Sequence, residues 1–394
     1  MNSGPPPGSQ ASLRERNRLR VLDAVREHGA LTQVEIAEVT GLSAATVSNV
    51  VKELDSGGAV GLSPSIRNGR RAVQVTLAAP EGLLAGIVYR DREVSVAIGD
   101  EPGRVLQQTR LPLPADHPAD EALNRGRRLL YDLLDASGHT IEQVHAVTVG
   151  ISAPIDSVSG QVGSESLLRG WRGVHVAEEM RAELGTHVYL ENSANLAALG
   201  EAKLGALQGV RDGVYLKASY GVGAGLILGG ELFRGSAGTA GEIGHVTIDE
   251  NGPVCRCGNR GCLDTFVGAQ ALLDAVRTSH GALTLRDLVT RAVDGDPGCR
   301  RVIEDAGRHI GVALAGVVNL LNPQVIVVGG ELARVGELLL HPIRETLSRC
   351  AIPSANHSVH LRPGQLADLA DVAGALVLAE RARETEHRAA VAAG

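Results

Sequence analysis

A cluster of cysteines and one histidine between residues 241 and 264 constrains this chain more than any other stretch. It reads G-E-I-G-H at 241–245 and C-R-C-G-N-R-G-C-L-D at 255–264, and it holds three of the five cysteines. Three thiolates and one imidazole form the ligand set of a closed, structural tetrahedral zinc site. Gly258 and Gly261 allow a turn that gathers the sulfurs around one ion. The alternative is a glycine-rich loop with reduced cysteines. The predicted ligands of Zn2+ are His245, Cys255, Cys257 and Cys262.

Charge is distributed unevenly along the chain. The 394 residues allow two or three domains, and their 44% hydrophobic but only 2% aromatic content predicts aliphatic cores. A net charge of −7 excludes a general polyanion binder. Residues 1–80, however, hold nine Lys/Arg against seven Asp/Glu, which gives +2 and leaves −9 for the remainder. A mildly basic N-terminal part on an acidic body suits a local contact with nucleic acid.

The pattern of apolar residues and cysteines indicates the cellular compartment. No apolar run reaches the length of a membrane span, and the N-terminus lacks a charged start followed by an apolar segment. Only Cys299 and Cys350 lie outside the cluster, which favours a metal in a reducing environment over disulfides. We therefore expect a cytoplasmic protein with no membrane partner.

Residues 13–80 carry the pattern of a helix-turn-helix, after a Pro-, Gly- and Ser-rich stretch at 1–12 that predicts a disordered tail. A first helix is expected from about residue 16 to Gly29. Thr32 then begins a capping box, and Ser43 caps a third helix. The spacing of Ala37, Gly41 and Val47 lets two helices cross closely around a turn.

The outer face of the third helix and the segment after it suit DNA. The helix presents short or hydrogen-bonding side chains that fit a major groove, namely Ala44, Ala45, Thr46, Ser48, Asn49 and Lys52. Two expected strands, Ala59–Leu62 and Ala72–Leu77, flank a hairpin tip with Asn68-Gly69 as its turn. The tip carries Arg67, Arg70 and Arg71. This pattern predicts a winged helix that binds double-stranded DNA; the alternative is a three-helix bundle with a polar face and a solvated loop.

Residues 81–394 alternate between strand and helix patterns, which predicts an α/β body of two lobes with a cleft between them. Two glycine-rich pieces, Tyr220–Gly225 and Gly329-Gly330, fit either phosphate-binding loops or plain tight turns. At 191–195 the chain reads Glu-Asn-Ser-Ala-Asn at a strand-to-helix junction. These polar side chains either enter the cleft or cap the helix through Asn192 or Ser193.

Several motifs together resemble the ROK family of repressors, open reading frames and sugar kinases. They are G-R-R-A-V-Q-V-T-L, E-N-S-A-N-L-A-A-L-G-E, Y-G-V-G-A-G-L-I-L-G-G-E-L-F-R-G, G-E-I-G-H, C-R-C-G-N-R-G-C and N-P-Q-V-I-V-V-G-G. The resemblance implies an actin-like, hexokinase-type (RNase H-like) body, with lobe one at about 81–195 plus the C-terminal helix and lobe two at about 196–366. It also implies a homodimer or homotetramer. The four predicted zinc ligands match those of the family.

The chain departs from the kinases of this family at two positions that matter for catalysis. The kinases begin the body with an Asp-x-Gly-Gly-Thr phosphate loop, whereas the corresponding stretch here is Val88–Arg92, which has no glycine and two arginines. Their catalytic base is the aspartate of a Glu-Asn-Asp motif, where this chain has Ser193. A hydroxyl does not take a sugar proton as a carboxylate does. We therefore expect no kinase activity.

The sugar-binding residues that the resemblance implies are only partly retained. Asn192, Glu242, His245 and Asp264 stand at matching positions, although Asp264 is one methylene shorter than the usual glutamate. Leu167 replaces an asparagine. Because a site built for hydroxyls discriminates by those hydrogen bonds, a changed set implies a changed or weaker ligand.

Together with the winged-helix pattern, the resemblance implies a repressor of carbohydrate-related genes that binds operator DNA and responds to a sugar or sugar derivative. Two alternatives remain open. One is an active ATP-dependent sugar kinase with a DNA-binding domain attached, and the other is a regulator that senses no ligand.

Overall fold

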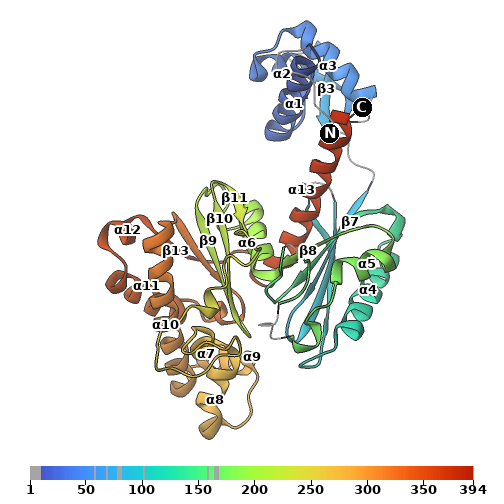
Figure 1. Cartoon of the computed structure of the whole chain (residues 1–394). Coiled ribbons are helices and arrows are strands. Elements are labelled where there is room, and N and C mark those ends of the chain that lie inside the picture. The colour runs from blue at the N-terminus through green and yellow to red at the C-terminus, as the bar shows by residue number, and fades with distance from the viewer. Residues whose placement is uncertain are drawn as a thin grey trace. The chain divides into compact units, whose positions relative to one another are not determined.

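The computed structural model describes residues 10–56, 59–67, 70–77, 82–100, 103–157, 159–163 and 168–393 (Figure 1). The chain divides into two compact units. One comprises Met1–Glu81 together with Glu384–Gly394, and the other Gly82–Arg383. The sequence assigned residues 384–394 to the body, whereas here they group with the N-terminal unit. Each unit is described by itself below.

The N-terminal unit holds three helices and a small sheet. The helices are α1 (Gln10–His28), α2 (Gln33–Thr40) and α3 (Ala44–Ser56). The strands, in the sheet order β1-β3-β2, are β1 (Leu31–Thr32), β3 (Arg70–Leu77) and β2 (Val60–Arg67). Val21, Ile36, Val47, Val51 and Leu54 are buried and form its aliphatic core. This is the predicted helix-turn-helix with a β-hairpin.

Local sequence signals explain where α2 begins and ends. The Thr32 N–H donates to the Glu35 carboxylate at 2.8 Å, and the Glu35 N–H donates to Thr32 Oγ1 at 3.4 Å, so the predicted capping box forms. Gly41 ends the helix with φ +66°, in the left-handed region that favours glycine. Its N–H donates to the Ala37 carbonyl at 2.9 Å.

Two boundaries in this unit differ from the prediction. Helix α1 begins at Gln10, six residues early, so residues 10–12 are helical rather than part of a disordered tail. Gln, Ala, Leu, Arg and Glu dominate its start and all favour helix. The hairpin strands are longer than expected, and their pairing runs from Val60↔Leu77 to Arg67↔Arg70. The predicted Asn68-Gly69 turn lies outside the described residues.

The first lobe of the body is built on a five-stranded sheet with the order β6-β5-β4-β7-β8. Its strands are β4 (Leu83–Tyr89), β5 (Glu93–Gly99), β6 (Val105–Pro112), β7 (Val144–Ile151) and β8 (His187–Asn192). β4, β7 and β8 are parallel, while β5 and β6 form an antiparallel meander with β4. Helices α4 (Ala119–Ala136) and α5 (Val176–Leu184) pack on one face through a largely aliphatic core that also includes Trp171.

The second lobe has a sheet of the same size, with the order β11-β10-β9-β12-β13. The strands are β9 (Gly213–Ala218), β10 (Val222–Leu228), β11 (Glu231–Phe233), β12 (Val325–Gly329) and β13 (His360–Pro363). One face is covered by helices that share a single core with it. They are α7 (Asp264–Val267), α8 (Ala269–His280), α9 (Leu285–Val293), α10 (Pro297–Leu321), α11 (Glu337–Cys350) and α12 (Pro353–Ser358).

Short 3-10 helices occur in both lobes. The first lobe has η1 (Ile141–Gln143) and η2 (Arg169–Trp171), and later in the chain come η3 (Ile243–His245), η4 (Glu331–Val335) and η5 (Ala367–Leu369).

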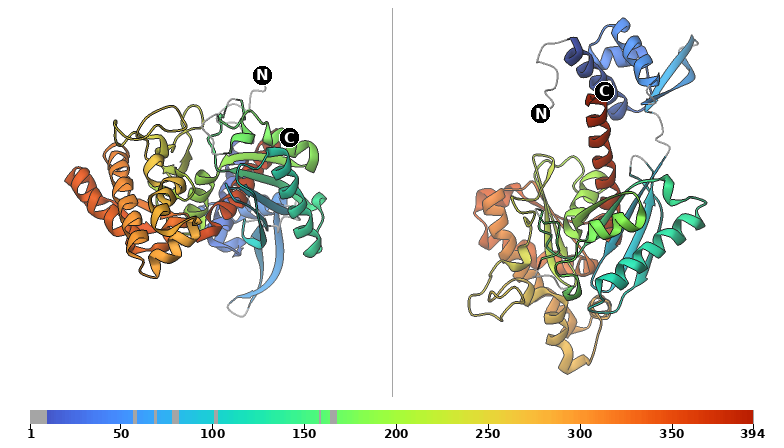
Figure 2. Two further views of the ribbon diagram at one scale, coloured as in Figure 1. Left: turned by 90° about the horizontal axis from the view of Figure 1, so that it is seen from below. Right: turned by 45° about the vertical axis from the view of Figure 1, so that its right-hand side comes forward.

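Two helices join the lobes, α6 (Ser193–Leu204) and α13 (Ala370–Ala393) (Figures 1 and 2). They share a core with residues of both sheets, including Leu84 and Tyr215. The helices approach closely at two glycines, because a Cβ on Gly200 would lie 2.2 Å from the Ala370 carbonyl oxygen and one on Gly374 only 1.7 Å from that of Leu196. The predicted α/β fold of two lobes is confirmed, with α6 shared between them.

None of the described helices is both long and apolar enough to span a membrane.

Candidate functional site

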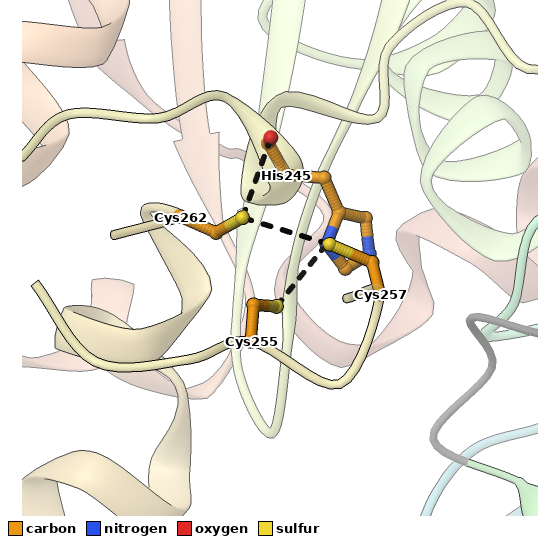
Figure 3. Close-up of side chains that lie close together, drawn as sticks. All are labelled: His245, Cys255, Cys257 and Cys262. Carbon is orange, nitrogen blue, oxygen red and sulfur yellow. Dashed lines mark hydrogen bonds between the residues drawn. The ribbon is translucent and has the colours of Figure 1, made fainter. Parts of the chain in front are cut away.

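The predicted metal ligands converge on one point (Figure 3). His245 ends η3, and the three cysteines come from the loop before α7. The candidate ligand atoms of His245, Cys255, Cys257 and Cys262 all lie within 4.8 Å of one another. Cys255 Sγ is 3.6 Å from His245 Nδ1, and Cys257 Sγ is 3.6 Å from Cys262 Sγ. Three sulfurs and one imidazole nitrogen around a common centre fit the tetrahedral coordination that zinc prefers.

The two glycines of this loop have the backbone conformations that the sequence predicted. Gly258 has φ +93° and Gly261 has φ +65°. The Cys255 N–H donates to the Asn259 carbonyl at 2.7 Å and the Gly258 N–H to the Cys255 carbonyl at 3.0 Å, which closes a tight turn. The turn carries the first two cysteines toward Cys262.

Replacing Gly261 with alanine is expected to destabilise the body by at least about 2 kcal/mol, because its Cβ would lie only 1.5 Å from the Asp249 carbonyl oxygen at a positive φ. Gly258→Ala is the matched control. It has the same kind of φ, but nothing lies within 4 Å of its Cβ, so a loss of about 1 kcal/mol is expected. Chemical denaturation of both variants measures the difference, and equal losses would contradict it.

A cavity of about 400 Å³ lies between the two lobes. Asn192 and Ser152 line it from the first lobe, and Lys217, Glu242 and His245 from the second. Three of the four predicted ligand-binding residues therefore border one cavity. His245 belongs to both the cavity and the candidate metal cluster, so the stretch from His245 to Cys262, called the metal loop below, borders the cavity.

Asn192 has two roles that the sequence left as alternatives. Its Oδ1 accepts from the Ala194 N–H at 2.7 Å, so it caps α6. Its Nδ2 donates to the Ala153 carbonyl at 2.8 Å and to Glu242 Oε1 at 3.5 Å across the cavity. The cap fixes the side chain that faces the cavity.

Asp264, the fourth predicted ligand-binding residue, is not among those that line the cavity. It is buried, its Oδ1 accepts from the Val222 N–H at 3.1 Å, and its Oδ2 accepts from Arg256 Nη1 at 2.8 Å. Arg256 does line the cavity. Asp264 is thus positioned to orient Arg256. The substituted Leu167 lies outside the described residues.

Arg90 lies in Val88–Arg92, the stretch that the resemblance aligns with the kinase phosphate loop. Arg90 follows β4, and its guanidinium donates to Asp371, to Glu93 at 2.7 Å and to Ser95 at 2.6 Å. Burial alone would lower the pKa of Arg90, but Asp371 and Glu93 outweigh it and raise that pKa. A charged side chain therefore stands where the resemblance places the kinases' glycine-rich phosphate loop.

Near Arg90, a second cation lies beside Ser193, the position where the resemblance puts the kinases' catalytic base. Lys217 Nζ on β9 lies 2.9 Å from both Ser193 Oγ and Asp371 Oδ2. Ser193 Oγ lies 2.9 Å from Ser152 Oγ. Burial would raise the pKa of Asp371, yet the charges of Arg90 and Lys217 hold it well below its usual range. Burial lowers the pKa of Lys217, against the opposing effect of Asp371.

These groups belong to a wider ion-pair network, called the interlobe network below. Its cations are Arg90, Arg110, Lys217, Arg286 and Arg334, and its carboxylates are Glu93, Glu331, Asp368 and Asp371. Its members lie just after β4 and in β5 and β6 of the first lobe, in β9, α9 and η4 of the second, and in η5 and α13. Five cations against four carboxylates leave an excess of one positive charge among these residues.

The sequence analysis missed Arg90, Lys217 and Asp371 as a cluster, because they are far apart in the chain. One signal was available for Lys217. It is one of three lysines, with Lys52 and Lys203, among 38 basic residues. Its compact ammonium fits sites that the planar guanidinium of arginine would not.

The predicted DNA-contacting face lies on one side of α3. Ala44, Ala45, Asn49 and Lys52 are exposed, and Thr46 and Ser48 are half-buried. Ser43 Oγ accepts from the Thr46 N–H at 3.2 Å, which is the predicted cap. Arg67 and Arg70 form the last pair of the β2–β3 hairpin, and Arg71 pairs with Ile66. The side chains of these three arginines lie outside the described part of the structure.

Comparison with known proteins gives two family matches and several relatives. Residues 86–382 match the ROK family, and residues 15–71 match the MarR family. The xylose repressor of Caldicellulosiruptor bescii is 29% identical over 392 residues, which cover 94% of this chain and 97% of that protein.

Solved structures of both regulators and kinases share the fold. A ROK family transcriptional regulator, described as a homologue of the E. coli MLC protein, has a TM-score of 0.78 at 24% identity and covers 94% of this chain and 96% of its own. A ROK family glucokinase from Streptomyces griseus, solved with glucose and AMPPNP, has a TM-score of 0.68 at 27% identity, over 76% of this chain and 100% of its own. With most of its length matched by the family model, this chain belongs to the ROK family.

Proposed function

We propose that this protein is a ROK-type transcriptional repressor that binds double-stranded operator DNA and controls carbohydrate-related genes in response to a sugar or sugar derivative. One observation carries the proposal. A MarR-type winged helix-turn-helix precedes a ROK body that carries Ser193 and Arg90 where the resemblance puts the kinases' base and phosphate loop, with Lys217 bonded to Ser193. The xylose repressor matches over the same combination of parts.

The same centre explains why the chain is a regulator and not a kinase. Phosphoryl transfer needs a cradle for the nucleotide phosphates and a base for the attacking hydroxyl. Here the Arg90 guanidinium, bonded to Asp371, occupies the first place. Ser193, which accepts from the Lys217 ammonium, occupies the second and cannot act as a base.

The sugar is proposed to bind in the cavity against Asn192, Glu242 and His245, while Asp264 acts by holding Arg256 toward the ligand. The metal cluster would bind a structural Zn2+ through its imidazole and three thiolates, because this donor set fits that ion. Zinc would then fix η3, which places Glu242 and His245 on the cavity wall.

On DNA, the exposed face of α3 would enter the major groove, with Arg67, Arg70 and Arg71 on the backbone or in the adjacent minor groove. We propose that the protein is cytoplasmic and forms a homodimer or homotetramer. An oligomer brings two DNA-binding domains together, and such a pair contacts half-sites about one helical turn apart. Ligand binding would act through a different affinity for the DNA-competent and released states.

The DNA-binding proposal is tested on α3. Lys52→Ala should weaken operator binding by about tenfold and reduce the slope of log affinity against log salt by about 1, because it removes a positive charge from the face that enters the major groove. Asn49→Ala should instead relax specificity at one base pair.

Genome-wide mapping of bound sites supplies the operator, and fluorescence anisotropy at several salt concentrations gives the slope. Glu53→Ala on the same helix is the control, because it removes a negative charge from an exposed position outside the proposed face. Unchanged salt dependence in Lys52→Ala would contradict the proposed face.

A further inference from the structure

The second half of α10 carries apolar side chains on two opposite faces. Residues 311–321 include no charged side chain. Leu314 and Val318 are fully buried in the core of the second lobe. On the opposite side of the helix, Val312 is 41% exposed and Leu320 is 85% exposed. Because a helix that is apolar all round is normally buried all round, this outer surface suits burial against a partner.

The exposed apolar residues form one continuous line. Val312, Gly316 and Leu320 follow each other at intervals of four residues, which places them along one face of α10. Ile352, which is 54% exposed, lies beside this face, because its N–H donates to Asn319 Oδ1 at 3.0 Å. Single exposed apolar residues are common, but a contiguous group of them marks an interaction site. Val312, Gly316, Leu320 and Ile352 are called the α10 stripe below.

Gly316, in the middle of the stripe, is a glycine that the fold of one chain does not require. It is exposed, and among the described residues nothing lies within 4 Å of the position that a Cβ would take. Its φ is outside the left-handed region that favours glycine. Glycine also weakens the middle of a helix relative to other residues. A glycine on a helix surface does, however, let the backbone of another helix approach closely.

The stripe is complementary to itself. Val312 and Leu320 lie about 6 Å on either side of Gly316 along the helix axis. A twofold axis through Gly316 that makes two copies of α10 antiparallel places Val312 of each copy against Leu320 of the other. Asp305 and Arg308, an ion pair nearer the start of α10, then fall outside the overlap. The uncharged half of each helix therefore meets the uncharged half of the other.

We propose that the α10 stripe is the interface of a homodimer in which two copies of α10 cross antiparallel at Gly316. A stable dimer buries about 800 Å² on each partner, around an apolar centre with a polar rim. Leu320 and Ile352 supply the large side chains of that centre, and the exposed Asn319 lies at its rim. The proposal rests on the oligomer of the proposed function and adds the surface through which it forms.

Two substitutions test this interface by analytical ultracentrifugation of the full-length protein. Leu320→Asp should raise the dissociation constant of the dimer at least about a hundredfold, because it places a charge in a desolvated contact. Gly316→Leu should have a similar effect, although leucine favours a helix more than glycine and its Cβ has open space within the chain. Circular dichroism should show both variants folded. Leu106→Asp on β6, where the leucine is 50% exposed, is the control and should leave the dimer unchanged.

Cross-linking tests the antiparallel crossing itself. In a Cys350→Ser background, which removes an exposed thiol, Gly316→Cys should form a covalent dimer with a short thiol-specific cross-linker. Arg308→Cys should not, because the two copies of residue 308 would lie about 24 Å apart along the antiparallel helices. Equal cross-linking at both positions would mean that the helices pair in parallel, and the proposed crossing would be wrong.

Two further results would overturn the proposal, and they differ in what else they affect. If the wild-type protein is a dimer and both Leu320→Asp and Gly316→Leu remain dimers, the interface lies elsewhere, although the oligomer of the proposed function stands. If the wild-type protein stays monomeric even on its operator, both this interface and the oligomer of the proposed function are wrong.

Discussion

Cys257→Ser is expected to prevent binding of the proposed zinc ion and to lower the stability of the body by at least about 3 kcal/mol. This loss is a fraction of the roughly 10–16 kcal/mol that zinc contributes to small zinc-finger peptides, because the rest of the lobe has its own core. The thermal midpoint should fall by about 5 °C or more. Since His245 lines the cavity, the variant should also lose the release of operator by ligand.

The matched control for this prediction is Cys350→Ser, which changes an exposed thiol outside the cluster. It should keep one zinc per chain and an unchanged midpoint. Metal analysis, thermal unfolding and operator binding with and without ligand measure the three effects. A Cys257→Ser protein with wild-type zinc content and wild-type operator response would show that the metal loop and the cavity are not coupled.

Asp371→Ala should destabilise the body by about 3–5 kcal/mol, because it leaves the cations of Arg90 and Lys217 buried without their shared carboxylate. The side chain of Asp371 is only 5% exposed, so solvent screens the interaction weakly. Asp368→Ala is the control. That carboxylate is 38% exposed, and a loss of about 1 kcal/mol or less is expected.

The effect of Asp371 should also depend on pH. Its pKa in the folded state is held below the unfolded value by the two cations. Its contribution is therefore present above the unfolded pKa of about 4 and is lost as pH falls toward the folded value. Urea unfolding between about pH 5 and pH 3 should show a steeper fall for the wild type than for Asp371→Ala. Parallel curves would contradict the assignment.

Local sequence signals predicted much of the structure correctly. The capping box at Thr32, the left-handed Gly41 and the convergence of the cysteines around Gly258 all depend on a few adjacent residues. The start of α1 was placed six residues late, because the composition of residues 1–12 outweighed the helix propensity of its last three. Element boundaries depend on such small differences in free energy.

The contacts among the residues that line the cavity could not be predicted from local sequence signals. Arg90, Lys217 and Asp371 are separated by more than a hundred residues each and meet only because two lobes and α13 pack together. Sequence reasoning recognised that Ser193 was not a base but did not predict that a lysine would bond to it. Asp264 matched a family position, yet its carboxylate bonds to Val222 and Arg256 and does not line the cavity.

The central claim, that the cavity senses a sugar and controls DNA binding without catalysis, is tested most directly by one titration. Fluorescence anisotropy of the full-length protein on its mapped operator is followed as ligand is added, with ATP consumption measured in the same samples. The account predicts that ligand weakens operator binding by about tenfold or more, that Glu242→Gln abolishes this response, and that no ATP is consumed. Sugar-dependent ATP turnover that is lost in Glu242→Gln would contradict it.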